Sequence, residues 1–302
     1  ERHALKKKRE RDWLPVTVLF LTVLLLVLCL VGFDHHEPDG PDGNGKAAES
    51  ELSADELQVT FFDVGKSDAI LVEQSGYRML IDTSFDDQAD VLLDYFADHG
   101  IDTLDYLIIT HFDKDHVGGA DKILDAMHVK RVLEPDYTVE KKQFREYREA
   151  LVRNRITAMR ITDVERRSLG KASFIIYPPE EKDYDGNDND LSLVLSLRYG
   201  TQSFLFTGDS EQERLTELME RTDLNLHHTV LKMPHHGIKE KNTIAFLEAV
   251  RPVAAVVTCR NEWWISGKIK RTLNWLGTDV YLTSNGNVVC LTDGNHVEFK
   301  QG

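Results

Sequence analysis

Apolar residues are arranged along this chain in two ways, as one long run near the N-terminus and as many short runs after residue 56. The long run, at 14–33, reads LPVTVLFLTVLLLVLCLVGF and holds no charged residue. As a helix it would span about 30 Å, the hydrocarbon thickness of a bilayer. The basic stretch KKKRER at 6–11 precedes it, which favours a cytoplasmic N-terminus and an external C-terminal part.

These features predict a single-pass cell-membrane protein, with a basic cytoplasmic N-terminus at 1–13 and a transmembrane helix or signal anchor at 14–33. The alternative is a cleaved signal peptide, which would make the protein secreted. We favour the retained anchor because the apolar run is long for a signal peptide and no A-x-A-like site follows it. Residues 34–55 are rich in Gly, Pro, Asp and Glu, and are predicted to form a flexible linker.

From residue 56 onward, short strand-like runs mix with amphipathic stretches. Helical periodicity predicts helices at 87–100, 140–154, 210–221, 242–250 and 267–277, the third with Ser210 as its N-cap. The strand-like runs begin with QVTFFDV, DAILVEQ, YRMLIDT and LDYLIIT and end with NVVCLTD and HVEFK. Two sheets packed face to face, with helices on the outside, would bury these runs on both faces. We therefore predict an α/β sandwich over 56–302.

Charge and cysteine content narrow the classes of partner and site. The formal net charge is −15, and an acidic surface repels polyanions, so tight nonspecific binding to long nucleic acid is not expected. The three cysteines have no zinc or disulfide-scaffold spacing. We predict that Cys259 and Cys290 are buried free thiols, with a disulfide between them as the alternative outside the cytoplasm.

The densest group of potential metal ligands follows the apolar run LDYLIIT. The loop HFDKDH supplies His111, Asp113, Asp115 and His116 within six positions. Alternate residues of an extended or turn-like loop point to the same side, so the two pairs can face two neighbouring ions. Gly118 and Gly119 follow and would permit a tight backbone turn into the next helix.

Two later strand ends carry the same residue types. FLFTGDS ends a strand at Asp209, and VLKMPHHG ends another at His235 and His236. A carboxylate can bridge two ions and a histidine can complete one of them. Three loops of this composition, each behind an apolar strand, therefore predict a metal site rather than solvated turns.

Several stretches of the chain carry a resemblance to a known family: FFDVGKSDAILV, MLIDTS, THFDKDHVGGA, NDLSLVLSL, LFTGDS and VLKMPHHG. From about residue 57 to its end, the chain resembles the metallo-β-lactamase fold, in particular the hydrolase domain of the competence DNA-uptake protein ComEC and its stand-alone relatives. In the broad superfamily the loop reads HxHxDH, and in this branch an aspartate replaces the second histidine, as Asp113 does here. The resemblance implies an αββα sandwich with a two-metal site at one edge.

The same resemblance implies a role for individual residues. His111 and Asp113 would hold one metal, Asp115 and His116 the other, and Asp209 would bridge them. One of His235 and His236 would complete the second site, and the other would lie nearby; the sequence leaves open which. The residues expected to support the site are Asp63, Asp68, Asp82, Asn189 and Ser192.

The predicted cofactors are two divalent ions, Zn or Mn. A carboxylate in place of an imidazole makes one site harder and more anionic, which favours manganese or another hard ion. A hydroxide that bridges the metals is the predicted nucleophile, and two ions can clamp the attacking and leaving oxygens of a phosphodiester. The predicted catalytic residues are Asp115, His235 and Lys232, with Lys232 and the spare histidine stabilising charge on the departing group.

The leading hypothesis is a membrane-tethered, external phosphoesterase or phosphodiesterase that acts on nucleic acid or a phosphorylated cell-envelope component. One alternative is hydrolysis of a lactone, thioester or amide, and another is a non-catalytic metal-binding module. The chain departs from the family pattern at three places. Two of them motivate the last alternative: Ile238 replaces a serine, and RNEWWISGK lacks an expected histidine. The third is DVGKSD in place of DVGQGD. The adjacent Trp263 and Trp264 are either packing residues or a stacking surface for a base or sugar.

Overall fold

The computed structural model describes residues 52–261 and 263–302. The predicted membrane segment at 14–33 and most of the predicted linker lie outside these residues. Within them, no helix has the length and apolar character needed to cross a bilayer. On this finding the predicted single-pass membrane location is not supported, and we withdraw it.

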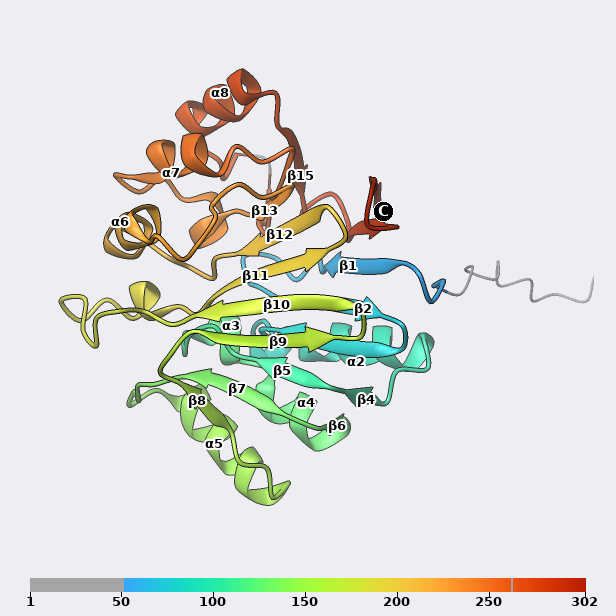
Figure 1. Ribbon diagram of the computed structural model, residues 1–302. Coiled ribbons are helices and arrows are strands. Elements are labelled where there is room, and N and C mark those ends of the chain that lie inside the picture. Colours follow the sequence, from blue (N-terminus) through green and yellow to red (C-terminus); the bar gives the residue numbers. More distant parts are fainter. Residues whose placement is uncertain (1–51, 262) are drawn as a thin grey trace, which may run out of the picture. The chain divides into compact units, whose positions relative to one another are not determined.

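Two large sheets form the centre of the fold (Figure 1). The first has the strand order β17-β16-β1-β2-β3-β5-β7-β8. Its strands are β1 (Leu57–Phe61), β2 (Ile70–Gln74), β3 (Tyr77–Ile81), β5 (Tyr106–Ile108), β7 (Val132–Pro135), β8 (Met159–Ile161), β16 (Val288–Thr292) and β17 (Val297–Gln301). Strands β3, β5, β7 and β8 run parallel, so their carboxyl ends lie along one edge of the sheet.

The second sheet has the order β15-β14-β13-β12-β11-β10-β9. Its strands are β9 (Glu165–Leu169), β10 (Ala172–Tyr177), β11 (Val194–Tyr199), β12 (Gln202–Phe206), β13 (Val230–Lys232), β14 (Ala254–Val257) and β15 (Asp279–Leu282). Strands β12 to β15 are parallel neighbours. A small third sheet pairs β4 (Thr103–Leu104) with β6 (His128–Val129).

Helices cover the outer face of each sheet, as Figure 1 shows. The first sheet carries α2 (Ala89–Asp98), α3 (Lys114–Val117), α4 (Ala120–Ala126) and α5 (Lys142–Arg153), and the second carries α6 (Gln212–Glu220), α7 (Thr243–Val250) and α8 (Gly267–Leu276). Short 3₁₀ turns lie at Asp86–Gln88, Asp188–Leu191 and Pro234–Gly237. The predicted αββα sandwich is therefore confirmed.

Apolar periodicity explains why these layers form. Helix α5 buries Phe144, Tyr147 and Leu151, which lie three and four positions apart, against the first sheet. Phe61, Phe174 and Phe206 come from facing strands and belong to one buried cluster between the two sheets. This core is rigid, so the loops at the strand ends are attached to fixed points.

One local prediction differs from the structure, and two strands were not predicted. Helix α6 begins after Glu211 and not after Ser210, whose hydroxyl instead donates to the Thr207 carbonyl at 2.6 Å. Strands β8 and β9 lie in a charged stretch that shows no apolar run, and both are at a sheet edge. Exposed edge strands tolerate charged side chains, so their pattern is weak. Cys259 and Cys290 are buried free thiols, as predicted.

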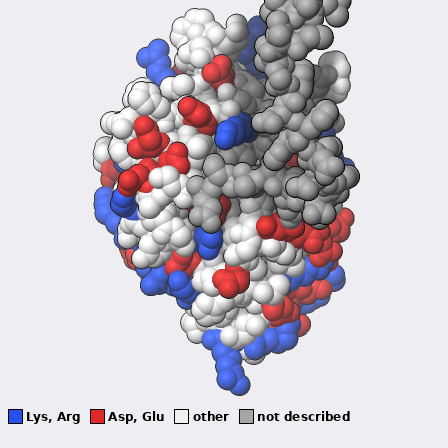
Figure 2. All heavy atoms as spheres, turned by 90° about the vertical axis from the view of Figure 1, so that its right-hand side faces the viewer, with Lys and Arg blue, Asp and Glu red and all other residues white. Residues whose placement is uncertain are grey.

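Charges of both signs are mixed on the surface. On the face shown in Figure 2, the described acidic and basic side chains interleave and do not gather into one continuous basic stripe. The described part of this face offers no broad electrostatic track for a long polyanion, in keeping with the net charge of −15.

Candidate metal centre

The ligand-bearing loops meet because their strands end at the same edge of the sandwich. The loop HFDKDH follows β5 in the first sheet, and Asp82 follows the parallel neighbour β3. In the second sheet, Asp209 follows β12 and the two histidines follow its parallel neighbour β13. The Leu193 N–H donates to the Thr110 carbonyl at 2.9 Å and ties the two edges together.

Four buried residues form the centre of the cluster: Asp115, His116, Asp209 and His236, whose ligand atoms all lie within 4.8 Å of one another. His116 Nε2 is 3.2 Å from Asp209 Oδ1, and His236 Nε2 is 3.1 Å from Asp209 Oδ2. His236 Nε2 is also 3.6 Å from Asp115 Oδ2. Asp209 therefore presents one oxygen to each histidine and lies at the middle of the group.

The donor atoms of this cluster fit a metal ion. The Nε2 atoms of His111, His116 and His236 are buried and have no hydrogen-bond partner. A buried imidazole nitrogen without a partner is costly, and a divalent cation satisfies it directly. The ring of His111 lies against that of His116, with centroids 4.0 Å apart, so all three histidines belong to one group.

Hydrogen bonds behind the histidines fix which nitrogen faces the cluster. Asp82 Oδ2 accepts from His116 Nδ1 at 2.7 Å, and Asp82 is itself held by the N–H and hydroxyl of Thr110, both at 2.7 Å. The Thr258 hydroxyl bonds His236 Nδ1 at 2.9 Å and donates to Asp68 Oδ1 at 2.7 Å. Partners of this kind orient the ligands of metal sites. Asp68 and Asp82 thus lie behind the cluster, and their supporting role stays a prediction.

Lys232 is fully buried behind the cluster. Its Nζ forms an ion pair with Asp68, donates to the Gly208 carbonyl at 2.8 Å and lies 3.4 Å from Asp209 Oδ1. Burial would lower the pKa of Lys232, but Asp68 and Asp209 raise it. This lysine therefore already neutralises Asp68, which argues against a further cation between Asp68 and Asp82.

The two adjacent histidines of VLKMPHHG both have a strained backbone conformation, and their side chains make different contacts. His235 and His236 have φ values of 45° and 51°, a left-handed conformation that non-glycine residues rarely adopt. His236 points into the cluster. His235 Nε2 is 4.0 Å from Asp209, while its Nδ1 lies 3.1 Å from Glu211 and 3.4 Å from Glu240.

The other predicted residues lie at increasing distance from the cluster. Ser192 Oγ accepts from the Asp209 N–H at 3.2 Å, and Asn189 Nδ2 donates to Glu211 at 2.7 Å. Asp113 is paired with Lys141, and its side chain is 34% exposed. Asp63 is exposed, and its N–H donates to Asn287; no described contact joins its side chain to the cluster.

Residues 62–259 match the family model described as Metallo-beta-lactamase superfamily. The chain belongs to this superfamily. Three curated relatives are ComE operon protein 3 of Bacillus subtilis (strain 168), Recombination protein 2 of Haemophilus influenzae and Competence protein ComA of Neisseria gonorrhoeae. They are 29%, 30% and 27% identical over 222, 213 and 234 residues. These relatives are ComEC-type competence proteins, which confirms the resemblance inferred from the motifs.

The matches cover 67%, 69% and 77% of this chain, but only 28%, 25% and 30% of the respective relatives. The chain therefore spans less than a third of their length. Among solved structures, the metallo-beta-lactamase fold protein YhfI from Bacillus subtilis has a TM-score of 0.53 at 10% identity, covering 81% of this chain and 100% of that one. CmlA, a diiron beta-hydroxylase from Streptomyces venezuelae, has a TM-score of 0.52 at 15% identity, covering 82% and 54%. At these identities the likeness shows the fold alone.

Membership of the metallo-beta-lactamase superfamily and the buried His/Asp cluster together indicate a metal-dependent hydrolase with a divalent-metal site. Burial would raise the pKa of Asp209, but His236 and His116 hold it well below its ordinary value. Burial and the neighbouring His116 lower the pKa of His111 to about 4. Burial would lower the pKa of His236, but Asp209 and Asp115 raise it to about 9. The pKa of His116 is raised as well, because Asp209 and Asp82 outweigh the effect of burial. Since a neutral imidazole is the form that binds metal, an ion would have to displace a proton from each of these two histidines.

The glycines of this superfamily loop have a different role from the predicted one. Gly118 and Gly119 have ordinary helical or near-helical φ values, so no special turn requires them. A Cβ at Gly118 would lie 2.2 Å from the Lys114 carbonyl oxygen, and one at Gly119 would lie 2.5 Å from the Thr83 carbonyl oxygen. They are needed because the loop packs directly on the backbone around Thr83.

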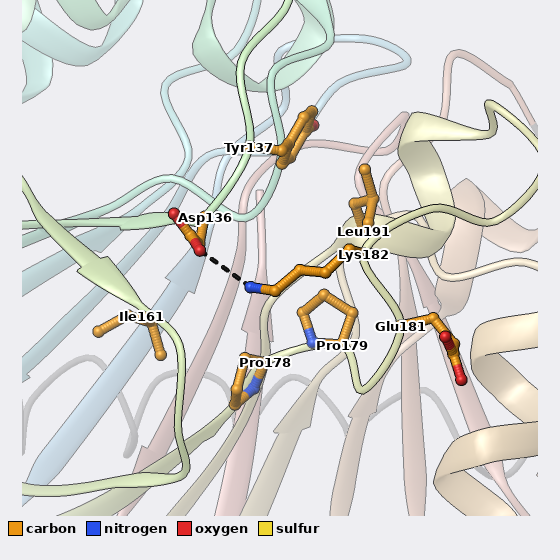
Figure 3. A pocket seen from close by; sticks show the side chains of 8 residues that line it. All are labelled: Asp136, Tyr137, Ile161, Pro178, Pro179, Glu181, Lys182 and Leu191. Carbon is orange, nitrogen blue, oxygen red and sulfur yellow. Dashed lines mark hydrogen bonds and ion pairs between the residues drawn. The ribbon is translucent and has the colours of Figure 1, made fainter.

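Two hollows lie beside the metal loop. The smaller one, shown in Figure 3, is crossed by a 2.9 Å bond from Lys182 to Asp136 and has room for about one water molecule. Its lining residue Tyr137 accepts from the Phe112 N–H at 2.8 Å and so buttresses the loop. The larger is an open depression of about 370 Å³, lined by Asp113, Lys114, Asp115, Lys141, Lys142 and Gln143.

Several residues of the site had no clear signal in the sequence. Thr110 and Thr258 hold Asp82 and His236 from strand ends, where a threonine is unremarkable as a residue type. Lys66 donates to Asp115 at 2.9 Å, and only its departure from the family pattern DVGQGD marks it. Glu211 and Glu240, which face His235, lie in unrelated helix-start segments.

Proposed function

We propose that this chain is a dinuclear-metal phosphodiesterase with a nucleic-acid-like substrate. The observation that carries this proposal is the buried convergence of Asp115 and Asp209 with three histidine Nε2 atoms that have no hydrogen-bond partner. Carboxylate and imidazole in this number suit a pair of divalent cations, with Zn or Mn as the candidates.

The donor set divides into two groups around Asp209. Asp115, His116, Asp209 and His236 would hold one ion. His111, Asp113 and Asp209 would hold the other, with Asp113 shared with Lys141. When bound, two such ions lower the pKa of a water molecule and offset negative charge on a phosphate.

The chain's own residues prepare this site. Asp82 and Thr258 fix the tautomers in which Nε2 of His116 and His236 faces inward. The buried Lys232 balances the charge of Asp68, so we assign it a supporting role instead of the leaving-group role predicted from the sequence. His235 lies between Glu211 and Glu240 and has its Nε2 4.0 Å from Asp209, so it is the remaining histidine close to the cluster.

The choice of a phosphodiester rests on two supports. A site rich in carboxylates favours hard ions and oxygen-rich substrates. The relatives bear the names Competence protein ComA and Recombination protein 2, and processes of that kind involve nucleic acid. Because the surface is acidic, a short or single-stranded substrate fits better than long duplex DNA.

Metal analysis coupled to hydrolysis tests the proposal. We expect about two divalent ions per wild-type chain and Mn- or Zn-dependent cleavage of bis(p-nitrophenyl) phosphate. Asp209→Ala should lose metal and at least about a thousandfold of the activity, whereas Asp279→Ala, an exposed aspartate on an edge strand, serves as the matched control. Full activity in Asp209→Ala would refute the mechanism.

The same assay separates the alternatives. Cleavage of aryl esters, lactones or thioesters without cleavage of phosphodiesters would favour a carbonyl substrate. Retention of two metals without turnover on any substrate would favour a non-catalytic metal-binding module, which the replacement at Ile238 first suggested.

A further inference from the structure

The open depression beside the ligand loop is built from two segments. Lys114 belongs to α3, which carries the ligands, and Lys142 and Gln143 open α5 after Lys141. Two metal-ligand candidates, Asp113 and Asp115, form its inner wall. The depression therefore opens directly onto the metal centre.

Asp115 links the depression to the buried cluster. It lines the depression, and its Oδ2 lies 3.6 Å from His236 Nε2, an atom of the proposed metal site. A molecule held in the depression is therefore one residue away from the metal centre. About 370 Å³ is room for a phosphate with its sugar.

The charges around the depression depend on the metal centre. Lys141 is paired with Asp113 and Asp188, and Lys66 with Asp115. Cations bound by Asp113 and Asp115 would neutralise these carboxylates, because each carboxylate oxygen that ligates an ion is no longer available to a lysine.

The remaining lysines are held loosely. Lys142 makes one surface pair, with Glu146 at 3.0 Å, and its side chain is 63% exposed. Lys114 lies 6.0 Å from the centre of the Phe85 ring. Surface pairs of this kind are worth little, so both ammonium groups are free to bind an anion.

The first turn of α5 adds positive electrostatic potential to the depression. It contains no acidic residue, and no side chain caps it, so the partial positive charge of the helix start is not offset locally. Three lysines, Lys114, Lys141 and Lys142, line the depression against two carboxylates, Asp113 and Asp115, so its lining has a small excess of positive charge on a protein whose net charge is −15.

We propose that this depression binds a backbone phosphate adjacent to the scissile one, so that the preferred substrate is a single-stranded oligonucleotide and not an isolated phosphodiester. This inference rests on the proposed function, since it assigns a subsite for the same substrate. Lysine acts here as a point charge on phosphate, and a contact remote from the reacting bond lowers KM more than it raises kcat.

A pair of substrates tests it: a thymidine dinucleotide with one phosphodiester, and a trinucleotide with a flanking phosphate. Lys142→Gln should raise KM for the trinucleotide roughly fivefold with kcat within about twofold, and the effect on the dinucleotide should be several-fold smaller. Lys114→Gln should act in the same direction. Lys268→Gln, an exposed lysine at the start of α8, is the charge-matched control.

Equal effects of Lys142→Gln on both substrates, or none on either, would overturn the subsite. If the wild type cleaves neither substrate, the proposed function fails, and binding then decides the subsite separately. Fluorescence anisotropy of labelled oligothymidylate with Ca²⁺ should show weaker binding for Lys142→Gln. The slope of log K against log salt should fall by about 0.7, the value for one phosphate of a single strand. An unchanged slope would reject the subsite without reference to catalysis.

Discussion

The metal centre has an inner half, at His116 and His236, and an outer half, at Asp113, and the two are built differently. In the inner half, His116 and His236 are fully buried, and each is oriented by a second residue, Asp82 or Thr258. In the outer half, Asp113 is partly exposed and its carboxylate is paired with a lysine on another element. The inner half is held by several short hydrogen bonds, and the outer half by ion pairs that water can replace.

This difference indicates how the site is divided between chemistry and substrate. A preorganised inner group keeps its geometry whether or not a ligand is present, which is what catalysis requires. An outer group that exchanges partners can respond to metal and substrate charge. Perturbing the inner half should therefore abolish activity, while perturbing the outer half should adjust affinity.

The largest loss of activity is expected when one of the two adjacent histidines, His236, is replaced. His236→Ala should lose one metal ion and at least about a thousandfold in kcat/KM, because it removes a donor at the centre of the cluster. His235→Ala, its sequence neighbour, should lose about ten- to a hundredfold and keep its metal content. Metal analysis and steady-state kinetics on both variants check this. Comparable metal loss in the two variants would contradict the division of roles.

A smaller loss of metal affinity or activity is expected when a hydrogen bond that orients a candidate ligand is removed. Asp82→Asn replaces an oxygen that accepts from His116 Nδ1 with an amide that can turn an N–H toward it, so the ring loses its orientation. We expect a ten- to hundredfold drop in metal affinity or activity, measured by metal titration. Asp63→Asn is the control, since Asp63 is exposed and has no described side-chain contact with the cluster. An Asp82→Asn variant with wild-type metal affinity would show that orientation matters little here.

The sequence predicts the inner half well and the outer half poorly, for a physical reason. The candidate ligands Asp115 and Asp209 follow apolar strands, and parallel strands bring their ends together, so their positions in the sequence already place them near each other. Lys141 lies in a helix-start segment like any solvated lysine, and only the packing of α5 beside the loop makes it a partner of Asp113. Which of His235 and His236 turns inward depends on φ values that the sequence does not display.

A milder effect is expected when Lys141 is replaced: metal should bind more tightly and the oligonucleotide more weakly. Lys141→Met removes the cation that competes for Asp113, so the affinity for the weaker-bound metal ion should rise about threefold, while KM for an oligonucleotide should rise by a similar factor. Metal titration and kinetics measure the two separately. Lys130→Met, which breaks a comparable pair with Asp105 at 2.8 Å, is the control. A fall in metal affinity would mean that Lys141 positions Asp113 for the metal instead of competing with it.

The smallest effect on activity is expected at a histidine outside the metal centre, just before β13 of the second sheet. His228 is buried and bonded to Ser196 Oγ at 2.7 Å, and burial lowers its pKa to about 4. The unfolded chain therefore takes up this proton near pH 6.5, before the folded chain does, so folding stability falls as the pH drops from about 6.5 toward 4. The loss approaches about 3 kcal/mol. His228→Gln should remove this part of the pH dependence, as measured by urea unfolding at pH 7 and pH 4.5, with kcat at pH 7 within about twofold of wild type. An unfolding free energy that falls equally in both proteins would place the acid sensitivity elsewhere, most simply in the buried carboxylates of the metal centre.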